Sequence, residues 1–306
     1  MNTHTQGPGK ILIIGGSGFV SGTLARTALA QDFETWVLTR GHRPVPDGAH
    51  SLVADRRDPS AFVRAIQEAE TDWDLVVDCI GYQPEDVVQD ISAFRKRTRH
   101  LAFVSTDFIF DPTNRRLPQT EESEHYATSG YGGNKRLCEL ELQNADCGDM
   151  AWTVVRPCHI YGAGSLLGCL PAHGRDADLI DRLRKGEVLD LVGGGHFLQQ
   201  PILAGDLCRL LLSLHGNVAT YNRIFCAAGP DIAESRSYYQ IVADILGVEL
   251  QVNEIPVDAY LAKNPNSAPF LCHRIYDLAQ LKASGAHVPA TSLEEGLRQH
   301  VNSLIC

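Results

Sequence analysis

The stretch ILIIGGSGFVSG, residues 11–22, decides the fold. It opens with four apolar residues, the pattern of a short buried β-strand, and continues through a glycine turn into a helical pattern. Gly15 permits a tight turn, Gly18 lets the backbone approach a pyrophosphate, and the N–H groups at the helix N-terminus attract that anion. The stretch therefore predicts a dinucleotide-binding loop. Its predicted cofactor contacts are Gly15, Gly16, Ser17, Gly18, Phe19 and Val20.

Short apolar runs alternate with helical patterns after this loop. The predicted strands are Ile11–Ile14, Trp36–Leu38, Leu52–Ala54, Leu75–Ile80, Leu101–Val104, Trp152–Val155 and a late Arg223–Ala228. Asp58 and Pro59 form a helix cap and first-turn pair, and apolar residues recur at helical spacing after Pro84. Apolar strands separated by helices indicate a parallel sheet that is covered on both faces.

We therefore expect an α/β fold with a doubly wound parallel (Rossmann) sheet and a smaller C-terminal substrate lobe. The regular pattern weakens after Pro157. The expected division assigns 1–158, with 201–229 returning to it, to the dinucleotide-binding domain. It assigns 159–200 and 230–306 to the substrate-binding lobe.

Composition and charge disfavour several classes of protein. The chain has 306 residues, a net charge of −10 and nine cysteines without a close Cys-x-x-Cys pair. An acidic chain disfavours nucleic acid as a partner, and the cysteines are expected to be reduced thiols, with neither disulfides nor a metal site. No signal peptide or membrane span is expected, so we expect a cytoplasmic protein with no membrane partner.

The end of the second strand bears on the choice of cofactor. An NAD site usually has an acid there, but this chain has Arg40 and Arg43, which suit a 2′-phosphate. NADP is therefore expected as the cofactor, with NAD as the alternative. The other interpretation is that both arginines are only solvated charges of the loop. Asp55 and Arg56, which follow the third strand, are placed where an adenine contact falls.

Three side chains form a candidate catalytic set. Tyr131 and Lys135 are four residues apart, so on a helix they share one side. A nearby ammonium lowers the pKa of a phenol, and such a tyrosine exchanges the proton that accompanies hydride transfer. Thr106 follows the fifth strand, where its hydroxyl can hold a substrate oxygen.

The order of glycine loop, strand-five Ser/Thr and Tyr-x-x-x-Lys resembles the extended short-chain dehydrogenase/reductases. Residues 55–59 (DRRDP), 76–84 (VVDCIGYQP) and 155–162 (VRPCHIYG) are similar to the NAD-dependent epimerase/dehydratase branch. The resemblance implies Thr106, Tyr131 and Lys135 as the catalytic set and nucleotide-linked sugars as the default substrate class. It also implies cofactor contacts at Cys79, Gly81, Pro157 and His159.

The run STDFIFD, residues 105–111, is the informative variant. Sugar 4,6-dehydratases tend to have Thr-Asp-Glu here, whereas this chain has Phe108 in place of the glutamate, so elimination lacks its expected base. The run resembles that of dTDP-4-dehydrorhamnose reductase, which reduces a keto sugar. Asp107 is either a general acid beside the substrate or a cap of the next turn.

Two departures from the family pattern concern binding. Ser21 replaces the third loop glycine, and we expect looser helix packing there. Gln199 replaces an arginine that helps relatives bind the substrate pyrophosphate. Either Arg175, Arg182 or Arg274 supplies that charge, or the substrate is not a nucleotide sugar.

Other residues have two interpretations each. His159 either contacts the substrate or caps backbone, and Tyr82 either walls the nicotinamide pocket or only packs. The basic run RKRTR, residues 95–99, either touches nucleic acid or a partner, or is a solvated helix end, which we favour. The lower-ranked substrate contacts are Tyr82, Asp107, Phe108, Gln199 and Arg274.

These features predict an NAD(P)-dependent oxidoreductase or epimerase acting on a hydroxyl or keto carbon, by default of a nucleotide-linked sugar. The alternatives are a non-catalytic NAD(P)-binding regulatory or RNA-associated relative, and a reductase of a small natural-product ketone. A homodimer is expected only by analogy with relatives. The sequence does not separate epimerase from reductase.

Overall fold

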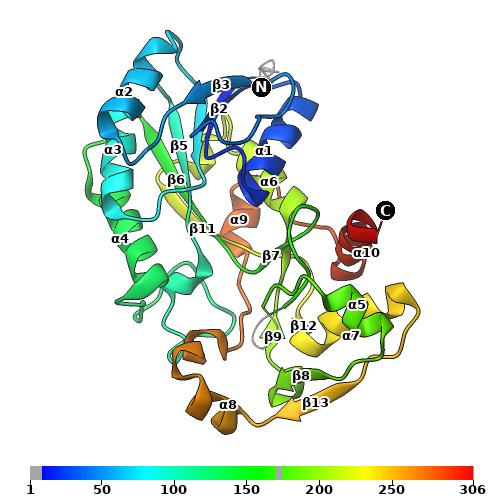
Figure 1. Ribbon diagram of the computed structural model, residues 1–306. Helices are drawn as coiled ribbons and strands as arrows, with labels where there is room; N and C mark the ends of the chain where they lie inside the picture. The colour runs from blue at the N-terminus through cyan, green and yellow to red at the C-terminus, as the bar shows by residue number, and fades with distance from the viewer. Residues whose placement is uncertain (1–8, 170–173, 306) are drawn as a thin grey trace.

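A parallel β-sheet forms the centre of the molecule (Figure 1). The computed structural model describes residues 9–169 and 174–305. The sheet has seven strands in the order β11-β6-β5-β4-β1-β2-β3, and every neighbouring pair is parallel. Its strands are β1 (Lys10–Ile14), β2 (Glu34–Thr39), β3 (His50–Val53), β4 (Leu75–Asp78), β5 (His100–Val104), β6 (Ala151–Pro157) and β11 (Arg223–Ala227).

The strand order reverses between β1 and β4, and this reversal places the binding crevice. The chain runs outward from β1 to β3 and then returns to the other side of β1 with β4. Ile14 therefore lies in register with Leu38 on one side and with Asp78 on the other. The loops that leave these strands part here and open a crevice at the carboxyl edge of the sheet. The predicted doubly wound sheet is confirmed.

Helices cover both faces of the sheet. The helices are α1 (Phe19–Ala30), α2 (Pro59–Glu68), α3 (Pro84–Phe94), α4 (Gly130–Asn144), α5 (Leu179–Arg184), α6 (Ala204–Leu212), α7 (Ser235–Leu246), α8 (Val257–Lys263), α9 (Ala279–Ala283) and α10 (Leu293–Ile305). Apolar residues of α1 and α6 pack on one face, and those of α2, α3 and α4 pack on the other. Every residue of β4 and β5 is buried, as expected of strands covered on both sides.

The predicted start of α2 is confirmed by its cap. The Asp58 carboxylate accepts a hydrogen bond from the Ala61 N–H at 3.0 Å, and Pro59 occupies the first helical turn. The fourth strand ends two residues earlier than expected, at Asp78. Its side chain accepts a hydrogen bond from the Ile80 N–H at 2.8 Å, which turns the chain out of the strand and toward the crevice.

A smaller lobe, lower right in Figure 1, has its own apolar core. Residues of α5, α7, α10 and β8 (Leu189–Val192) form this core, and β8 pairs with β13 (Val252–Ile255). Two further short pairs join β7 (Ile160–Tyr161) to β10 (Ile202–Leu203) and β9 (Leu198–Gln199) to β12 (Ala233–Glu234). Tyr276, Leu278 and Leu281, around α9, pack in the core of the sheet instead.

Within residues 9–169 and 174–305, no helix combines the length and apolar character needed to cross a bilayer.

His100, the first residue of β5, gives the fold a pH dependence. Its ring is fully buried, with Nδ1 3.2 Å from the Leu214 carbonyl and Nε2 2.7 Å from the Thr153 hydroxyl. Burial lowers the pKa of His100 from 6.5 to about 4, and the Leu214 carbonyl only partly offsets this. The folded protein therefore keeps His100 neutral at a pH where the unfolded chain is protonated.

We expect the wild-type protein to lose about 3 kcal/mol of unfolding free energy from this residue as the pH falls from 6.5 to 4. His100 contributes no such loss above pH 6.5, because the ring is then neutral in both states. Urea unfolding across this range should show a flatter pH dependence for His100→Gln, whereas His125→Gln, at an exposed position, should keep the wild-type slope. Equal slopes for all three proteins would contradict this assignment.

Candidate active site

The glycine loop has the conformation that a bound pyrophosphate requires. Gly15 has φ +103°, and a Cβ at this position would lie 2.6 Å from the Ile80 side chain, so the turn needs glycine. The N–H groups of Phe19 and Val20 open α1 and so have no intrahelical acceptor. These two groups are suited to bind an anion.

Ser21 strengthens the loop through two hydrogen bonds, and the expected looser packing of the helix stays a prediction. Its hydroxyl donates to the Gly15 carbonyl at 2.6 Å and accepts from the Gly18 N–H at 3.1 Å. The side chain is buried and ties the two ends of the turn together. The hydroxyl thus makes two hydrogen bonds that a third glycine could not make.

A cavity of about 640 Å³ adjoins the loop on the β2 side. Five basic residues line it, together with Asp55 and Asp86: Arg40, His42, Arg43, Arg56 and Arg57. The Arg43 guanidinium donates to the Ser17 carbonyl at 3.4 Å, so this side chain lies over the loop. Arg40 is exposed. The cavity thus has the basic character predicted from the end of the second strand.

Arg56 borders the same cavity but its guanidinium is used within the protein. It lies 3.0 Å from Asp78, 3.1 Å from Asp86 and 3.0 Å from Asp90. Burial and the neighbouring Asp78 charge raise the pKa of Asp90 well above its usual value. Burial would also raise the pKa of Asp78, but the Arg56 charge, with hydrogen bonds from Asp90 and the Ile80 N–H, outweighs it and holds that pKa below its usual value. The expected adenine contact by Arg56 is therefore corrected to an internal ion pair that supports the end of β4.

A second cavity, of about 320 Å³, lies on the other side of the loop and contains the predicted catalytic set. Thr106, Tyr131 and Lys135 all line it, and so do the predicted contacts Cys79 and Pro157. Gly18, Phe19 and Val20 form its wall toward α1. The structure therefore brings the glycine loop and the Thr/Tyr/Lys residues to one place.

The Lys135 ammonium is buried at the base of this cavity. It donates to the Gly81 and Val104 carbonyls, both at 2.6 Å, and lies 4.4 Å from the centroid of the Phe103 ring. Burial lowers the pKa of Lys135, and the Asp78 charge opposes that shift. An ammonium has three N–H donors, so one is left over after these two bonds. Gly81 was predicted as a cofactor contact. In the structure its carbonyl accepts a hydrogen bond from the Lys135 ammonium.

Tyr131 and Thr106 line the same cavity, and Thr106 affects the pKa of the phenol. Burial raises the pKa of the Tyr131 phenol, and a hydrogen bond from Thr106 opposes the rise. The predicted net lowering of this pKa is therefore wrong for the structure as it stands, because burial outweighs the favourable interactions. The phenol is neutral here, and its ring is half exposed at the mouth of the cavity.

Gly132 and Gly133 explain why α4 can place its first turn here. A Cβ at Gly132 would lie 2.0 Å from the Phe108 carbonyl oxygen, and one at Gly133 would lie 2.8 Å from the Thr128 backbone. Only residues without a side chain let the helix pass this close to the chain that follows β5. These two glycines sit between Tyr131 and Lys135, and we did not single them out from the sequence.

Glu139, one helical turn beyond Lys135, fixes α4 to the sheet. Its buried carboxylate accepts from the Ser105 hydroxyl at 2.6 Å and from two Arg156 nitrogens at 2.9 and 2.7 Å. Ser105 precedes Thr106, and Arg156 belongs to β6. The pair therefore holds the ends of two strands against the helix that carries the tyrosine and lysine.

Asp107 is a structural carboxylate, and the general-acid interpretation is corrected. Burial alone would raise the pKa of Asp107, but Arg274 and Arg115, with the Tyr276 hydroxyl, outweigh it and hold that pKa below its usual value. Arg274 pairs with Asp107 and donates to the Pro269 carbonyl at 2.8 Å. Arg274 is almost completely buried, so it is not a free ligand for a substrate anion.

Aromatic rings wall the mouth of the site beside Tyr131. Its ring centroid lies 6.2 Å from that of Phe108 and 6.4 Å from that of Tyr82. Phe108 in turn packs 5.5 Å from Phe270, which precedes the segment that carries Arg274. Tyr82 borders both cavities, as the wall interpretation predicted, whereas Phe270 gave no signal in the sequence.

Gln199 is buried, and His159 is partly buried. Gln199 is 1% exposed, its Nε2 donates to the Cys272 carbonyl at 3.4 Å, and its Oε1 has no partner among the described residues. Arg182 is committed to Asp176 and Glu187 at 2.8 and 3.1 Å. Burial, with the Arg175 charge, lowers the pKa of His159 to about 4, so its ring is neutral.

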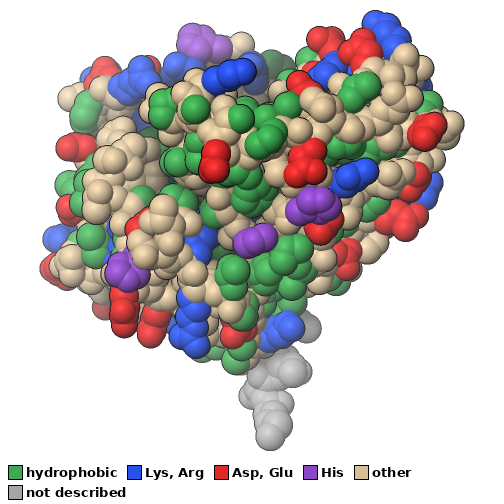
Figure 2. Space-filling view, turned by 90° about the horizontal axis from the view of Figure 1, so that it is seen from below, with side chains coloured by type: hydrophobic (Ala, Val, Ile, Leu, Met, Phe, Trp, Pro, Cys, Tyr) green, Lys and Arg blue, Asp and Glu red, His purple; other side chains and the backbone are tan. Residues whose placement is uncertain are grey.

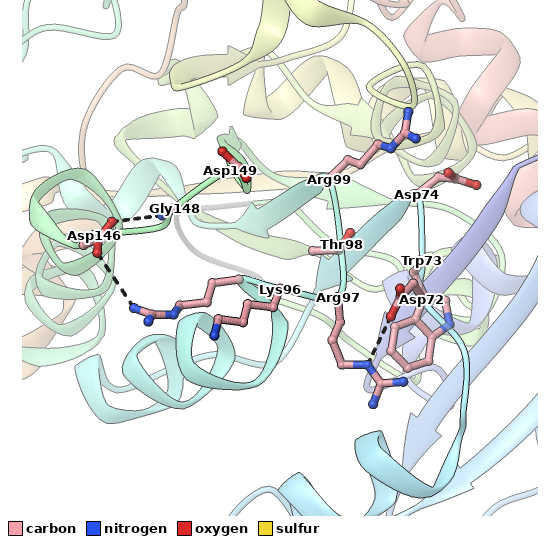
Figure 3. A pocket seen from close by; sticks show the side chains of 11 residues that line it. Asp72, Trp73, Asp74, Lys96, Arg97, Thr98, Arg99, Asp146, Gly148 and Asp149 are labelled. Carbon is pink, nitrogen blue, oxygen red and sulfur yellow. Dashed lines mark hydrogen bonds and ion pairs between the residues drawn. The ribbon is translucent and has the colours of Figure 1, made fainter.

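The basic run at residues 95–99 lies at the opposite edge of the sheet, beside a cavity of about 590 Å³ (Figure 3). Arg97 binds Asp72 at 3.2 Å, and Arg95 lies 3.9 Å from Asp146. Asp74 and Asp149 also line this cavity, so the two signs of charge are balanced. On the face seen from below, basic and acidic side chains are likewise interspersed (Figure 2).

Comparison with known proteins adds the family to this geometry. Residues 11–226 match the model of the NAD dependent epimerase/dehydratase family. The chain belongs to this family. Its predicted place among the extended short-chain dehydrogenase/reductases is thereby confirmed, and so is its nature as an enzyme of that type.

Solved structures share the fold. A UDP-glucose 4-epimerase from Thermotoga maritima, solved with UDP-glucose, has TM-score 0.78 and 17% identity, covering 97% of this chain and 98% of that one. A UDP-glucose 4-epimerase from Thermus thermophilus, in complex with NAD, has TM-score 0.72 and 18% identity, covering 97% and 99%.

One curated relative is similar in sequence. It is the chloroplast stem-loop binding protein of 41 kDa b from Arabidopsis thaliana, 26% identical over 235 residues. The match covers 72% of this chain and 58% of that protein.

Proposed function

We propose that this enzyme transfers hydride between a nicotinamide cofactor, preferably NADP, and a hydroxyl or keto carbon of its substrate. The observation that carries the proposal is the meeting of Thr106, Tyr131 and Lys135 with the glycine loop in one cavity. The bound cofactor would supply or accept the hydride. The substrate-binding lobe is proposed to comprise residues 159–200 and 230–306, with the part around α9 packed on the sheet.

The residues present fit a dinucleotide. Phe19 and Val20 offer backbone N–H groups for a pyrophosphate, and Asp55 lines the cavity where an adenosine is expected. The third N–H donor of Lys135 is available for ribose hydroxyls. Tyr131 would exchange the substrate proton, and Thr106 would orient the substrate oxygen.

The neutral state of Tyr131 favours one direction of proton transfer in the resting enzyme. A phenol whose pKa is raised stays protonated at neutral pH, so it carries the proton that a keto oxygen needs when its carbon gains hydride. To remove a hydroxyl proton, Tyr131 must first ionise, and the Thr106 hydrogen bond is the interaction that favours this. Reduction of a ketone is therefore the step for which the resting site is better prepared.

A nucleotide-linked sugar is the proposed substrate class, because the structural relatives include two UDP-glucose 4-epimerases. Gln199 is uncharged, and Arg182 and Arg274 are held in ion pairs, so of the three arginines named from the sequence only Arg175 is left to supply the missing charge. The aromatic wall formed by Phe108 and Phe270 suits an apolar group equally well. A small natural-product ketone therefore stays as the alternative substrate.

Tyr131→Phe should lower kcat about 10²- to 10⁴-fold, the range for loss of a positioned acid–base group. UDP-glucose, UDP-N-acetylglucosamine and a set of cyclic ketones would be assayed with NADPH and NADP⁺. Net NADPH consumption identifies a reductase, and product formed without net consumption identifies an epimerase. Tyr260→Phe, in α8, is the matched control and should keep wild-type kcat.

A Tyr131→Phe enzyme with wild-type kcat and an intact fold would refute the assigned role of the phenol. Turnover of the ketones but of neither sugar nucleotide would refute only the proposed substrate class.

The wild-type enzyme should bind NADPH at least about 10-fold more tightly than NADH, because Arg40 and Arg43 offer charged donors to a 2′-phosphate. The double variant Arg40→Ala, Arg43→Ala should bring the two affinities within about 3-fold of each other. Fluorescence titration of the reduced cofactors measures both. A wild-type preference for NADH would contradict this assignment and leave NAD as the cofactor.

The sequence similarity to a stem-loop binding protein supports one alternative, a relative that binds RNA and is not catalytic. The balanced charges around residues 95–99 and the net charge of −10 oppose it. In the same titrations, salt-sensitive binding of a stem-loop RNA with no binding of either dinucleotide would favour this alternative over the enzyme.

We include a homodimer in the proposal, formed through α3 and α4. Val88 on α3 and Leu137 on α4 expose about half of their surface, and these two helices pack side by side. Sedimentation equilibrium distinguishes a dimer from a monomer.

A further inference from the structure

Arg175 is an uncompensated cation at the mouth of the catalytic cavity. It lies in the segment between β7 and α5, is exposed, and donates one guanidinium hydrogen bond to the Ile160 carbonyl at 3.2 Å. Within the described part of the chain, no carboxylate lies within ion-pair distance of it. The acid next to it in sequence, Asp176, is bound to Arg182 at 2.8 Å.

The Arg175 side chain reaches from the substrate lobe to the start of α1. Its guanidinium carbon lies 5.7 Å from the centroid of the Phe19 ring, and Phe19 is the first residue of that helix. Arg175 lines the same cavity as Gly18, Phe19 and Val20. Arg175 belongs to the substrate lobe, and the N-terminus of α1, which is suited to an anion, belongs to the other lobe. Both border the same cavity.

The groups near Arg175 leave its charge unneutralised. Burial lowers the pKa of His159 and of His300, and the Arg175 charge lowers both further, so neither ring adds a charge. The His300 ring is held by the Ser165 carbonyl at 2.9 Å. The surroundings therefore contain one positive charge and neutral partners, which is an environment that attracts an anion.

The two other arginines that could supply this charge show the contrast. Arg182 and Arg274 each face carboxylates of the same chain, and Arg274 is also almost completely buried. Arg175 alone, among these three candidates named from the sequence, keeps its fork of donors open to a ligand. A guanidinium fork matches the geometry of phosphate oxygens.

We propose that Arg175 binds the pyrophosphate of the dinucleotide, from the opposite side to the α1 N-terminus. This rests on the cofactor site proposed above and adds a ligand contributed by the substrate lobe. The position against Phe19 assigns the side chain to the cofactor and not to a diphosphate on the substrate. One consequence is that the two lobes grip the same group, so Arg175 slows cofactor release.

Arg175→Gln should weaken NADPH binding about 10- to 100-fold, the loss expected for a pair of charge-assisted hydrogen bonds. NADPH and UDP would be titrated separately into the full-length protein, by fluorescence and by calorimetry. UDP carries the diphosphate of a sugar nucleotide but lacks a nicotinamide, so it reports on the substrate side. Its binding should change less than about 2-fold. Arg175→Lys keeps the charge but loses the guanidinium fork. Its affinity for NADPH should lie between those of the wild type and Arg175→Gln.

Arg184→Gln, which removes an exposed arginine at the end of α5, is the matched control and should bind NADPH as the wild type does. Thermal unfolding of each variant checks that the fold is kept. Weakened UDP binding with unchanged NADPH binding would overturn the proposal and assign Arg175 to the substrate. Unchanged binding of both ligands would overturn it as well. If the wild-type protein binds no dinucleotide at all, the cofactor site itself fails, and this outcome is separate from the Arg175 result.

Discussion

The burial of the Lys135 ammonium between two backbone carbonyls is the constraint on which the site depends. A buried cation without partners is very costly, so Gly81 and Val104 must both present their oxygens at hydrogen-bonding distance. Gly81 follows β4, and Val104 ends β5. The lysine thus fastens α4 to the carboxyl ends of the two strands beside the crevice, and Tyr131 and Thr106 come together as a result.

Buried ion pairs hold the same strand ends from behind. Arg56 braces Asp78 at the end of β4, Arg156 and Glu139 brace β5 and β6, and Arg274 braces Asp107 after β5. Removing one member of such a pair leaves an uncompensated charge inside the protein. Buried ion pairs therefore surround the base of the candidate site, whereas Tyr131 at its mouth is half exposed.

Local patterns in the sequence were enough to predict the sheet, the glycine loop and the Thr106, Tyr131 and Lys135 set. Apolar runs, a helix cap at Asp58 and the position of Thr106 after a strand each depend on neighbours close in the chain. The roles of the charged residues were harder to predict, because their partners are distant in the sequence. Arg274 and Asp107 are 167 positions apart, so the sequence predicted a substrate contact for Arg274, and a general acid or a turn cap for Asp107, but not the pair that they form. The hydrogen bonds of Ser21 were missed for a different reason: its partners Gly15 and Gly18 are close in the chain, but the contact depends on how the turn folds back.

The most direct measurement of the central claim is the affinity of NADPH for Lys135→Met, determined by calorimetry beside its thermal unfolding. If the ammonium is held by two carbonyls so that its third donor meets the cofactor ribose, the variant should remain folded and bind NADPH about 10-fold or more weakly, because a hydrogen bond from a charged group is lost. A folded Lys135→Met protein that binds NADPH as tightly as the wild type would contradict it.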